Sequence, residues 1–352
     1  MKLIKKDRLG ELLAAIAESE ALYLPVDRDD GNAEYRRYEE GTELSSKLNT
    51  VRSAKDFFFP QTENLVDFKL SGNNIEVIDP RRECEDFVIF GVRACDAASF
   101  SVLDRVFIET PPEDTFYKNR REHATIVTLA CSRPAATCFC HTFGIDMTEP
   151  KGGDITAWEL ENGYAFRAET EKGSALLARL DSLFTDDASA EGEIAEQREQ
   201  TKARAEKLPL SSLTTEKFDG RDMLTTFRDS RWASLSEACL GCGTCTFVCP
   251  TCQCYDIKEF KTSNGVKRFR CWDSCMYSDF TKMAGGQPRL TQLERFRQRF
   301  MHKLIYFPMN NDGVYGCVGC GRCLARCPIH MNIVKVMKEL GKEAADNEKS
   351  IE

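Results

Sequence analysis

The spacing of apolar residues predicts a mixed α/β domain over residues 1–190. Residues 86–92 (DFVIFGV) have the composition of a short buried strand, and a helix is expected soon after it, near residues 97–107. The pattern recurs at residues 125–130 (TIVTLA), where a second buried strand leads into a loop that begins at Cys131. Strands that alternate with helical segments are typical of an α/β arrangement.

Three further segments of this region have a clear pattern. Residues 158–168 alternate apolar and polar positions around Glu-Asn-Gly, which predicts a β-hairpin, and residues 171–184 have the apolar spacing of a helix. Residues 1–20 are interpreted as an amphipathic helix, because Asp7 and Glu11 interrupt the apolar core that a secretion signal needs. No apolar run approaches the roughly 18 residues that cross a bilayer. We therefore expect a cytoplasmic protein with no membrane contact.

The polar, charged stretch around residues 186–207 predicts a domain boundary. We expect a charged linker or solvated helix over residues 191–221. A second domain over residues 222–341 should consist mainly of short helices wrapped around cysteine-rich loops. The tail, residues 342–352, is expected to be flexible.

Residues 290–304 carry the clearest helical pattern of this second domain. Apolar residues would share one face and basic residues would be interleaved with them: Leu293, Phe296, Phe300 and Leu304, with Arg295, Arg297, Arg299 and Lys303. We favour a core stripe beside a solvated basic face over a stripe that binds phosphate or an acidic partner.

Cysteine usage is the outlier of the composition: 17 of the 352 residues are cysteine, mostly in tight groups. In a reducing compartment such groups indicate metal or redox chemistry rather than disulfide bonds. The net charge is −8, yet residues 201–352 hold 24 Lys and Arg against 17 Asp and Glu. Because this basic part is also the cysteine-rich part, we interpret its surplus as compensation for negative thiolates. The acidic total disfavours nucleic-acid binding.

One cysteine motif, Cys-x-x-Cys-x-x-Cys-x-x-x-Cys-Pro, occurs twice, starting at Cys239 and at Cys317. Three thiolates at steps of three can wrap one 4Fe–4S cluster, whereas the fourth is carried off by the next helical turn and reaches the other cluster. The motif thus predicts two clusters with crossed ligands: Cys239, Cys242, Cys245 and Cys327 for the first, and Cys317, Cys320, Cys323 and Cys249 for the second.

Zinc is the alternative for these cysteines. Structural zinc sites use paired Cys-x-x-Cys knuckles with four ligands, which leaves a third cysteine at the same step, followed by Cys-Pro, unexplained in both copies. Iron–sulfur chemistry is therefore favoured. The expected fold class is α+β: an N-terminal mixed α/β domain followed by a mainly helical ferredoxin domain with two clusters.

Four cysteines of the first domain form a further candidate site. Cys95 and Cys131 each follow a predicted strand, so both should emerge at the carboxyl edge of one sheet, where α/β folds hold ligands. Cys138 and Cys140 lie in the same loop as Cys131. Four converging thiols suit a third 4Fe–4S cluster. The alternative is a set of small buried thiols that bind no metal.

The remaining cysteines and histidines receive no firm role. Cys252, Cys254, Cys271 and Cys275 lie between the two motifs and allow a fourth cluster, a redox-active thiol pair or plain packing, which we favour. Cys84 is isolated, and no histidine is assigned as a ligand. No Gly-x-Gly-x-x-Gly turn or phosphate loop is present, so we expect no flavin or nicotinamide site in this chain.

The chain resembles a family of 4Fe–4S dicluster electron-transfer subunits, which includes the β subunits of cytoplasmic sulfhydrogenases and the corresponding iron–sulfur subunit of anaerobic sulfite reductase. The resemblance is carried by residues 91–104 (GVRACDAASFSVLD), 128–140 (TLAC…CFC), 239–256, 271–286 and 317–330, and it covers most of the chain between residues 87 and 335. It supports the eight motif ligands and makes a cluster at Cys95, Cys131, Cys138 and Cys140 more plausible. Cys252, Cys254 and Cys275 fit the family pattern, whereas Cys271 is an addition.

The resemblance implies an electron-transfer subunit of an anaerobic oxidoreductase complex. Such a protein relays electrons between a flavin-containing, NAD(P)H-reactive subunit and a catalytic subunit of the hydrogenase, sulfite reductase or heterodisulfide reductase type, and is not itself catalytic. Two alternatives stay open. The chain could reduce a disulfide or a sulfur oxyanion at an open cluster near Cys252, Cys254 and Cys275, or it could be a zinc-stabilised scaffold. Arg231, Arg322 and Arg326 are expected to tune the cluster potentials.

Overall fold

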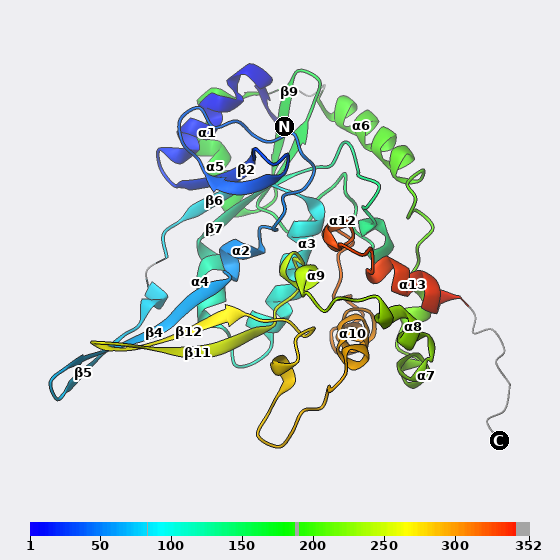
Figure 1. Cartoon of the computed structure of the whole chain (residues 1–352). Helices are drawn as coiled ribbons and strands as arrows, with labels where there is room; N and C mark the ends of the chain where they lie inside the picture. The colour runs from blue at the N-terminus through cyan, green and yellow to red at the C-terminus, as the bar shows by residue number, and fades with distance from the viewer. Residues whose placement is uncertain (83, 187–189, 343–352) are drawn as a thin grey trace.

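The computed structural model describes residues 1–82, 84–186 and 190–342, and its strands form two sheets (Figure 1). The predicted flexibility of residues 343–352 lies outside the described residues. The first sheet has eight strands, of which β2, β6, β7 and β8 are parallel and the other neighbours antiparallel. In spatial order they are β10 (Thr185–Asp186), β1 (Lys2–Lys5), β9 (Gly163–Ala168), β8 (Ile155–Glu159), β7 (Ala124–Leu129), β6 (Phe87–Val92), β2 (Ala21–Asp27) and β3 (Ala33–Arg37).

The central strands are buried on both faces, because successive side chains of a strand point to opposite sides of a sheet. On β6, Val88 and Phe90 pack into one core cluster with helices α1 (Leu9–Ala17) and α5 (Glu171–Arg179). Ile89 packs on the other side with α2 (Lys55–Phe58), α3 (Ala94–Asp104) and α4 (Thr115–His123). The predicted strands at residues 86–92 and 125–130 are thus confirmed as β6 and β7.

The beginning of the chain corrects one prediction. Residues 1–20 do not form a single helix, because Lys2–Lys5 is strand β1 and pairs antiparallel with β9. Only Leu9–Ala17 is α-helical, with Leu12, Leu13 and Ile16 buried against the sheet. An apolar pair followed by lysines fits a helix and a strand equally well over four residues, and the strand gains ladder hydrogen bonds that only the folded sheet provides.

The other predicted elements of the first half are confirmed. Strands β8 and β9 form the antiparallel hairpin expected at residues 158–168, and α5 lies within residues 171–184. The charged stretch forms helix α6 (Ala190–Ala205), which is not solvated on every side. Its Ile194 packs with Trp158 of β8, and Thr201 donates a hydrogen bond to the carbonyl oxygen of Ser132 at 3.2 Å.

The second sheet joins strands from both halves of the sequence and projects from the body of the molecule (Figure 1). Its order is β11 (Tyr255–Thr262), β12 (Gly265–Trp272), β4 (Thr62–Ser71) and β5 (Asn74–Ile78). Arg270 of β12 is buried and forms ion pairs with Glu63 of β4 and with Asp114 at the start of α4. The hairpin β11–β12 was not predicted, because the sequence pattern indicated only helices and loops beyond residue 222.

The remaining helices are short and lie beyond residue 222, as expected. They are α7 (Met223–Arg228), α8 (Arg231–Glu237), α9 (Thr244–Phe247), α10 (Gln292–Met301), α11 (Phe307–Asn310), α12 (Arg322–Arg326) and α13 (Ile333–Gly341). Helix α10 continues into a π-helical turn, His302–Tyr306. Phe296, Phe300 and Leu304 are buried in one cluster, so the predicted core stripe is confirmed. None of the helices in the described part of the chain is both long enough and apolar enough to cross a membrane.

Replacement of Gly163 by Ala tests the pairing of β1 with β9. An added Cβ would lie 2.3 Å from the carbonyl oxygen of Ile4, so the two strands must separate. We expect the free energy of unfolding to fall by about 1–3 kcal/mol. Denaturant titration followed by circular dichroism measures it. The matched control is Gly192→Ala on α6, where an added Cβ meets no atom within 4 Å. Equal stability of the two variants would contradict the β1–β9 register.

Candidate iron–sulfur sites

The cysteines predicted to hold the second cluster line one cavity. Cys249 comes from the first motif copy, and Cys317, Cys320 and Cys323 come from the second. Together with Phe139 and Pro250 they surround a small buried cavity of about 20 Å³ (the second-cluster cavity). Sequence spacing proposed this crossed set of thiols, and the structure brings all four to the same cavity.

The two motif copies have the same backbone conformation. Gly243 and Gly321 both adopt left-handed conformations, with φ of 74° and 77°, and each directly precedes a short helix, α9 or α12. Helices α9 and α12 pack against each other. A side chain is disfavoured at such φ values, so glycine allows the loop to turn sharply between its second and third cysteines. The repeat in sequence is therefore also a repeat in structure.

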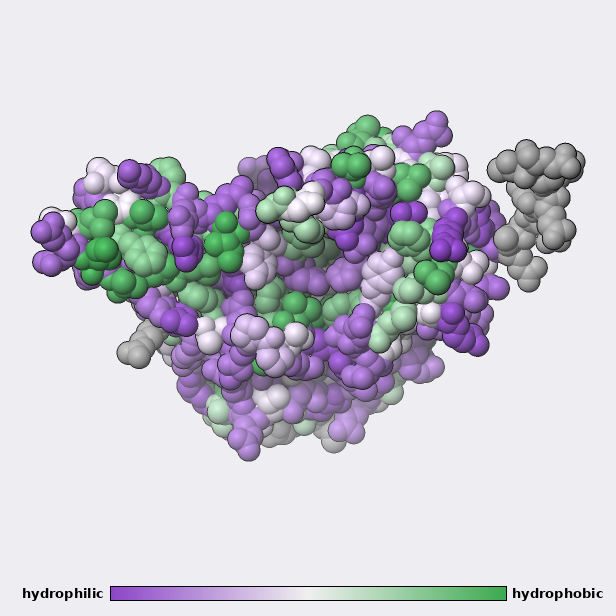
Figure 2. All heavy atoms as spheres, turned by 90° about the horizontal axis from the view of Figure 1, so that it is seen from below, coloured by the Kyte–Doolittle hydropathy of each residue, from purple (hydrophilic) through white to green (hydrophobic). Residues whose placement is uncertain are grey.

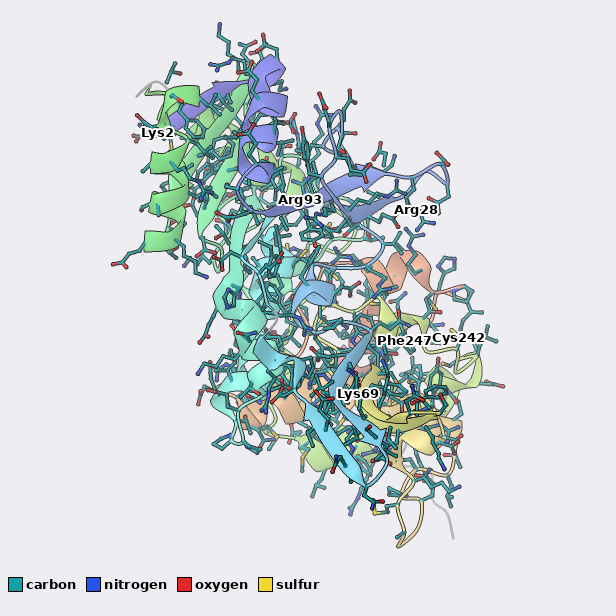
Figure 3. All side chains as sticks on the ribbon, turned by 90° about the vertical axis from the view of Figure 1, so that its left-hand side faces the viewer. Lys2, Arg28, Lys69, Arg93, Cys242 and Phe247 are labelled. Carbon is teal, nitrogen blue, oxygen red and sulfur yellow. The ribbon has the colours of Figure 1, made fainter. Side chains whose placement is uncertain are left out.

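The cysteines predicted for the first cluster lie nearer to the surface. Cys242 is exposed and lies at the outer edge of the molecule in Figure 3, close to the hydroxyl of Thr244 at 3.4 Å. The hydrogen bond from Thr244 lowers the pKa of Cys242 below its ordinary value. Cys239 accepts a hydrogen bond from Gln292 at 3.5 Å, and Cys327 packs against the same hydrophobic cluster as Cys239. The thiol of Cys327 donates a hydrogen bond to the carbonyl oxygen of Met331 at 3.3 Å.

The four cysteines of the first domain are all buried. Cys95 begins helix α3 after β6 and Cys131 follows β7, so both lie at the carboxyl ends of neighbouring parallel strands, as predicted. Burial raises the pKa of Cys138 to about 11, and it also raises the pKa of Cys95, Cys131 and Cys140. These groups are neutral thiols near pH 7, and a metal centre is what would deprotonate them. Four thiols suit an iron–sulfur cluster, but among the described residues no group of three or more possible ligand side chains is close enough together to hold a metal ion.

The N-terminal set (Cys95, Cys131, Cys138 and Cys140) adjoins the second-cluster cavity. Cys95, Cys131 and Cys140 belong to the same packed cluster as Cys320. The backbone N–H of Phe139 donates a hydrogen bond to the carbonyl oxygen of Gly319 at 3.0 Å. A Cβ on Gly319 would lie 2.4 Å from the backbone of Phe139, so the two loops can approach this closely only because the residue is glycine.

A buried ion pair fixes the same interface. Arg322, between Cys320 and Cys323, pairs with Asp96, which follows Cys95, and their second contact measures 2.7 Å. Both side chains are at most 3% exposed. Arg322 was expected to raise a cluster potential, but its charge is compensated by Asp96. Arg326 bonds to Asn32, and Arg231 pairs with Asp229, so both of these arginines are engaged away from the cavity.

Two basic residues of helix α10 and its extension face the cavity instead. Arg299 and Lys303 line it and are only 3% and 5% exposed. The prediction that they belong to a solvated basic face is therefore wrong. Burial alone would lower the pKa of Lys303, but the neighbouring Cys249 and Cys252 raise it above its ordinary value. Burial would also lower the pKa of Arg299, but the neighbouring Cys245 and Cys252 raise it above its ordinary value.

A third buried basic residue, Lys55 on α2, approaches from the first half of the chain, and burial lowers its pKa. Its ammonium group donates to the carbonyl oxygen of Cys252 at 3.0 Å and lies 3.6 Å from the centre of the Trp272 ring. Sequence reasoning missed Lys55, Arg299 and Lys303 as site residues. Lys303 carried a signal, because at 3.6 residues per turn it falls about 20° from Phe296, inside the apolar stripe. Lys55 carried none, because its place depends on the tertiary fold.

Of the cysteines between the two motif copies, three lie near the buried basic residues and Cys271 lies apart from them. Cys252 contacts Cys249, and Cys254 contacts Cys275, all near Arg299 and Lys303. Cys271 lies on β12 opposite Asp256 and is not part of this group.

These sites define the class of protein. Residues 238–331 match the family model described as a 4Fe-4S dicluster domain, so the chain is an iron–sulfur protein. Over 334 residues it is 34% identical to Sulfhydrogenase 2 subunit beta of Pyrococcus furiosus. The aligned region covers 94% of this chain and 95% of that protein. The chain therefore belongs to the family of sulfhydrogenase β subunits, as its motifs implied. No solved structure was found to match it.

Removal of one partner from the Asp96–Arg322 pair should destabilise the protein strongly. Arg322→Met leaves a buried carboxylate unpaired, and we expect the free energy of unfolding to fall by about 3–5 kcal/mol. The double variant Asp96→Leu with Arg322→Met should recover most of this loss. Denaturant unfolding of the single and double variants measures both effects. The control is Arg326→Met on the same helix, and an Arg322→Met variant no less stable than this control would refute the buried pair.

Proposed function

We propose that the chain is the electron-transfer subunit of an oxidoreductase complex. In this role it relays electrons between a flavin-containing, NAD(P)H-reactive subunit and a catalytic subunit of the hydrogenase, sulfite reductase or heterodisulfide reductase type. The observation that carries the proposal is the second-cluster cavity, where four motif cysteines from two distant segments meet beside two buried cations. Family membership supports the same assignment.

The ligands follow the crossed pattern. Cys249, Cys317, Cys320 and Cys323 would hold one 4Fe–4S cluster. The other cluster, called the first cluster above, would be held by Cys239, Cys242, Cys245 and Cys327. When bound, each cluster takes up and gives back one electron. A zinc scaffold is a weaker interpretation, because paired Cys-x-x-Cys knuckles with four ligands leave the third cysteine of each motif copy, followed by Cys-Pro, without a role.

The N-terminal set would hold a third cluster at Cys95, Cys131, Cys138 and Cys140. Its contact with the second-cluster cavity through Phe139 and Gly319 supports an arrangement of the three sites in series. Cys242 is exposed at one end of this series. We infer that one partner protein docks at the surface around Cys242 and the other beside the N-terminal domain.

The buried cations would set the cluster potential. Arg299 and Lys303 lie beside the thiols of the second-cluster cavity, where little water screens their charge. Positive charge favours the reduced cluster because reduction adds negative charge. Arg299 and Lys303 would thus tune the potential of this cluster in addition to Arg322, which acts on the thiol of Cys320 although it is paired with Asp96.

Replacement of Cys320 by Ala tests the ligand assignment. The variant should lose the EPR signal of one cluster together with about four of the irons bound per chain, and electron flow between the partner subunits should fall sharply. Cys84→Ala is the matched control, because Cys84 lies outside every predicted ligand set. Unchanged iron content and EPR spectra in the Cys320 variant would reject the assignment.

Iron and acid-labile sulfide in the anaerobically purified protein distinguish two clusters from three. About twelve irons per chain would support the N-terminal cluster, whereas about eight would leave its cysteines as structural thiols. Zinc in place of iron, in a colourless protein, would overturn the electron-transfer role itself.

Lys303→Met should lower a cluster potential by on the order of tens of millivolts, because a buried positive charge beside the thiols is removed. An EPR-monitored reductive titration measures the midpoint. Arg297→Met serves as the control: Arg297 lies on the same helix but stacks on Phe227 at 3.7 Å. Midpoints that shift equally in the two variants would argue against a specific effect of Lys303.

A further inference from the structure

Cys254 and Cys275 are brought together by the hairpin β11–β12. Cys254 directly precedes β11, whose first residue, Tyr255, pairs with Trp272 at the end of β12. One residue beyond, the backbone N–H of Asp273 donates to the carbonyl oxygen of Cys254 at 3.0 Å. The chain therefore leaves the hairpin alongside Cys254 and reaches Cys275 two residues later. The two side chains therefore lie next to each other, close enough to shift each other's pKa.

This pair belongs to neither motif copy and is not among the residues that line the second-cluster cavity. Both side chains are partly exposed. Arg299 and Lys303, which face the cavity, also act on Cys275, so the pair lies in the same positive environment as the cluster ligands. The thiol nearest in sequence, Cys271, is held on β12 opposite Asp256 and does not join the pair.

The protonation of the two thiols is asymmetric. The hydrogen bond from Cys254, supported by Arg299 and Lys303, lowers the pKa of Cys275 to about 7. The same hydrogen bond raises the pKa of Cys254 well above its ordinary value. One thiolate beside one thiol is the ionisation state from which a disulfide forms most readily, because the thiolate is the reactive species.

We propose that Cys254 and Cys275 are a redox-active dithiol that interconverts with a disulfide. On oxidation, the sulfurs of Cys254 and Cys275 form one S–S bond, the S–H bond of Cys254 breaks, and its proton passes to solvent. Two electrons leave the pair and reduce two one-electron acceptors, the 4Fe–4S clusters of the same chain. The pair would store electrons two at a time beside centres that carry them singly. The choice of acceptor rests on the proposed function, whereas the disulfide itself does not.

The position of the pair outside both motif copies, together with the closeness of the two side chains, favours a dithiol over a set of cluster ligands. Cys249 and Cys252 also lie close together, but Cys249 belongs to a motif copy and lines the second-cluster cavity. Neither Cys254 nor Cys275 does so, and two neighbouring thiols need only a small movement to form a disulfide.

Disulfide mapping of the full-length protein tests the proposal. Anaerobic protein is equilibrated with dithiol–disulfide buffers of graded potential, trapped with an alkylating agent, digested and analysed by mass spectrometry. We expect two fewer alkylated thiols per chain in the oxidised samples and a cross-linked peptide that joins Cys254 to Cys275. The cross-link should disappear again on reduction.

Variants separate the dithiol from a metal site. Cys254→Ser and Cys275→Ser should abolish the cross-link and retain the iron and sulfide content of the parent protein, and the control Cys271→Ser should keep both. Loss of iron in the first two variants but not in the control would make these cysteines cluster ligands and overturn the dithiol. Full alkylation of both thiols in the oxidised parent protein would overturn it equally, and this measurement needs no variant to fold. Neither result affects the outcome of the Cys320→Ala experiment, which tests the proposed electron-transfer function at a different cysteine.

Discussion

Positive charge buried without carboxylate partners constrains the cysteine-rich part of the fold. Arg299 and Lys303 are at most 5% exposed, and neither forms an ion pair with a carboxylate in the described ranges. A buried, uncompensated charge costs several kcal/mol. Nearby cysteine sulfurs raise the pKa of both groups, so these sulfurs are available to supply the compensating charge. Metal-bound thiolates would supply it at neutral pH, where free thiols are mostly protonated.

The same requirement explains why the two halves of the chain interlock. Lys55, on α2 of the first half, contacts Cys252 of the second half. Arg322, in the second half, pairs with Asp96 on α3 of the first half. Asn49 donates a further hydrogen bond to the carbonyl oxygen of Cys320 at 3.1 Å. Each of these contacts satisfies a polar group at the interface between the N-terminal sheet and the second motif. The α/β domain is therefore part of the wall around the second-cluster cavity.

The sequence allowed prediction of the features that depend on local spacing. The crossed cysteine sets, strands β6 and β7 and the hairpin β8–β9 follow from short-range patterns, and the structure gathers Cys249 with Cys317, Cys320 and Cys323 as the motif required. Features that depend on tertiary contacts were missed. Strands β11 and β12 carry many charged residues, and they join the sheet because β12 pairs with the distant strand β4. Lys303 was assigned to a solvated face because lysine is rarely buried, and its anionic surroundings come from residues distant in sequence.

The second sheet has a consequence for the order in which the chain folds. The β4–β12 ladder aligns Lys69 with Gly265, so about 200 residues separate partners that must meet. During synthesis β4 and β5 emerge early, with their apolar side chains Leu70, Ile75 and Val77 exposed, as they still are on the projecting sheet (Figure 2). The hairpin β11–β12 emerges only when most of the chain has been made. Until then the β4 edge is open to pairing with other chains, so the slowly completed second sheet is the part of the fold most exposed to misassembly during synthesis.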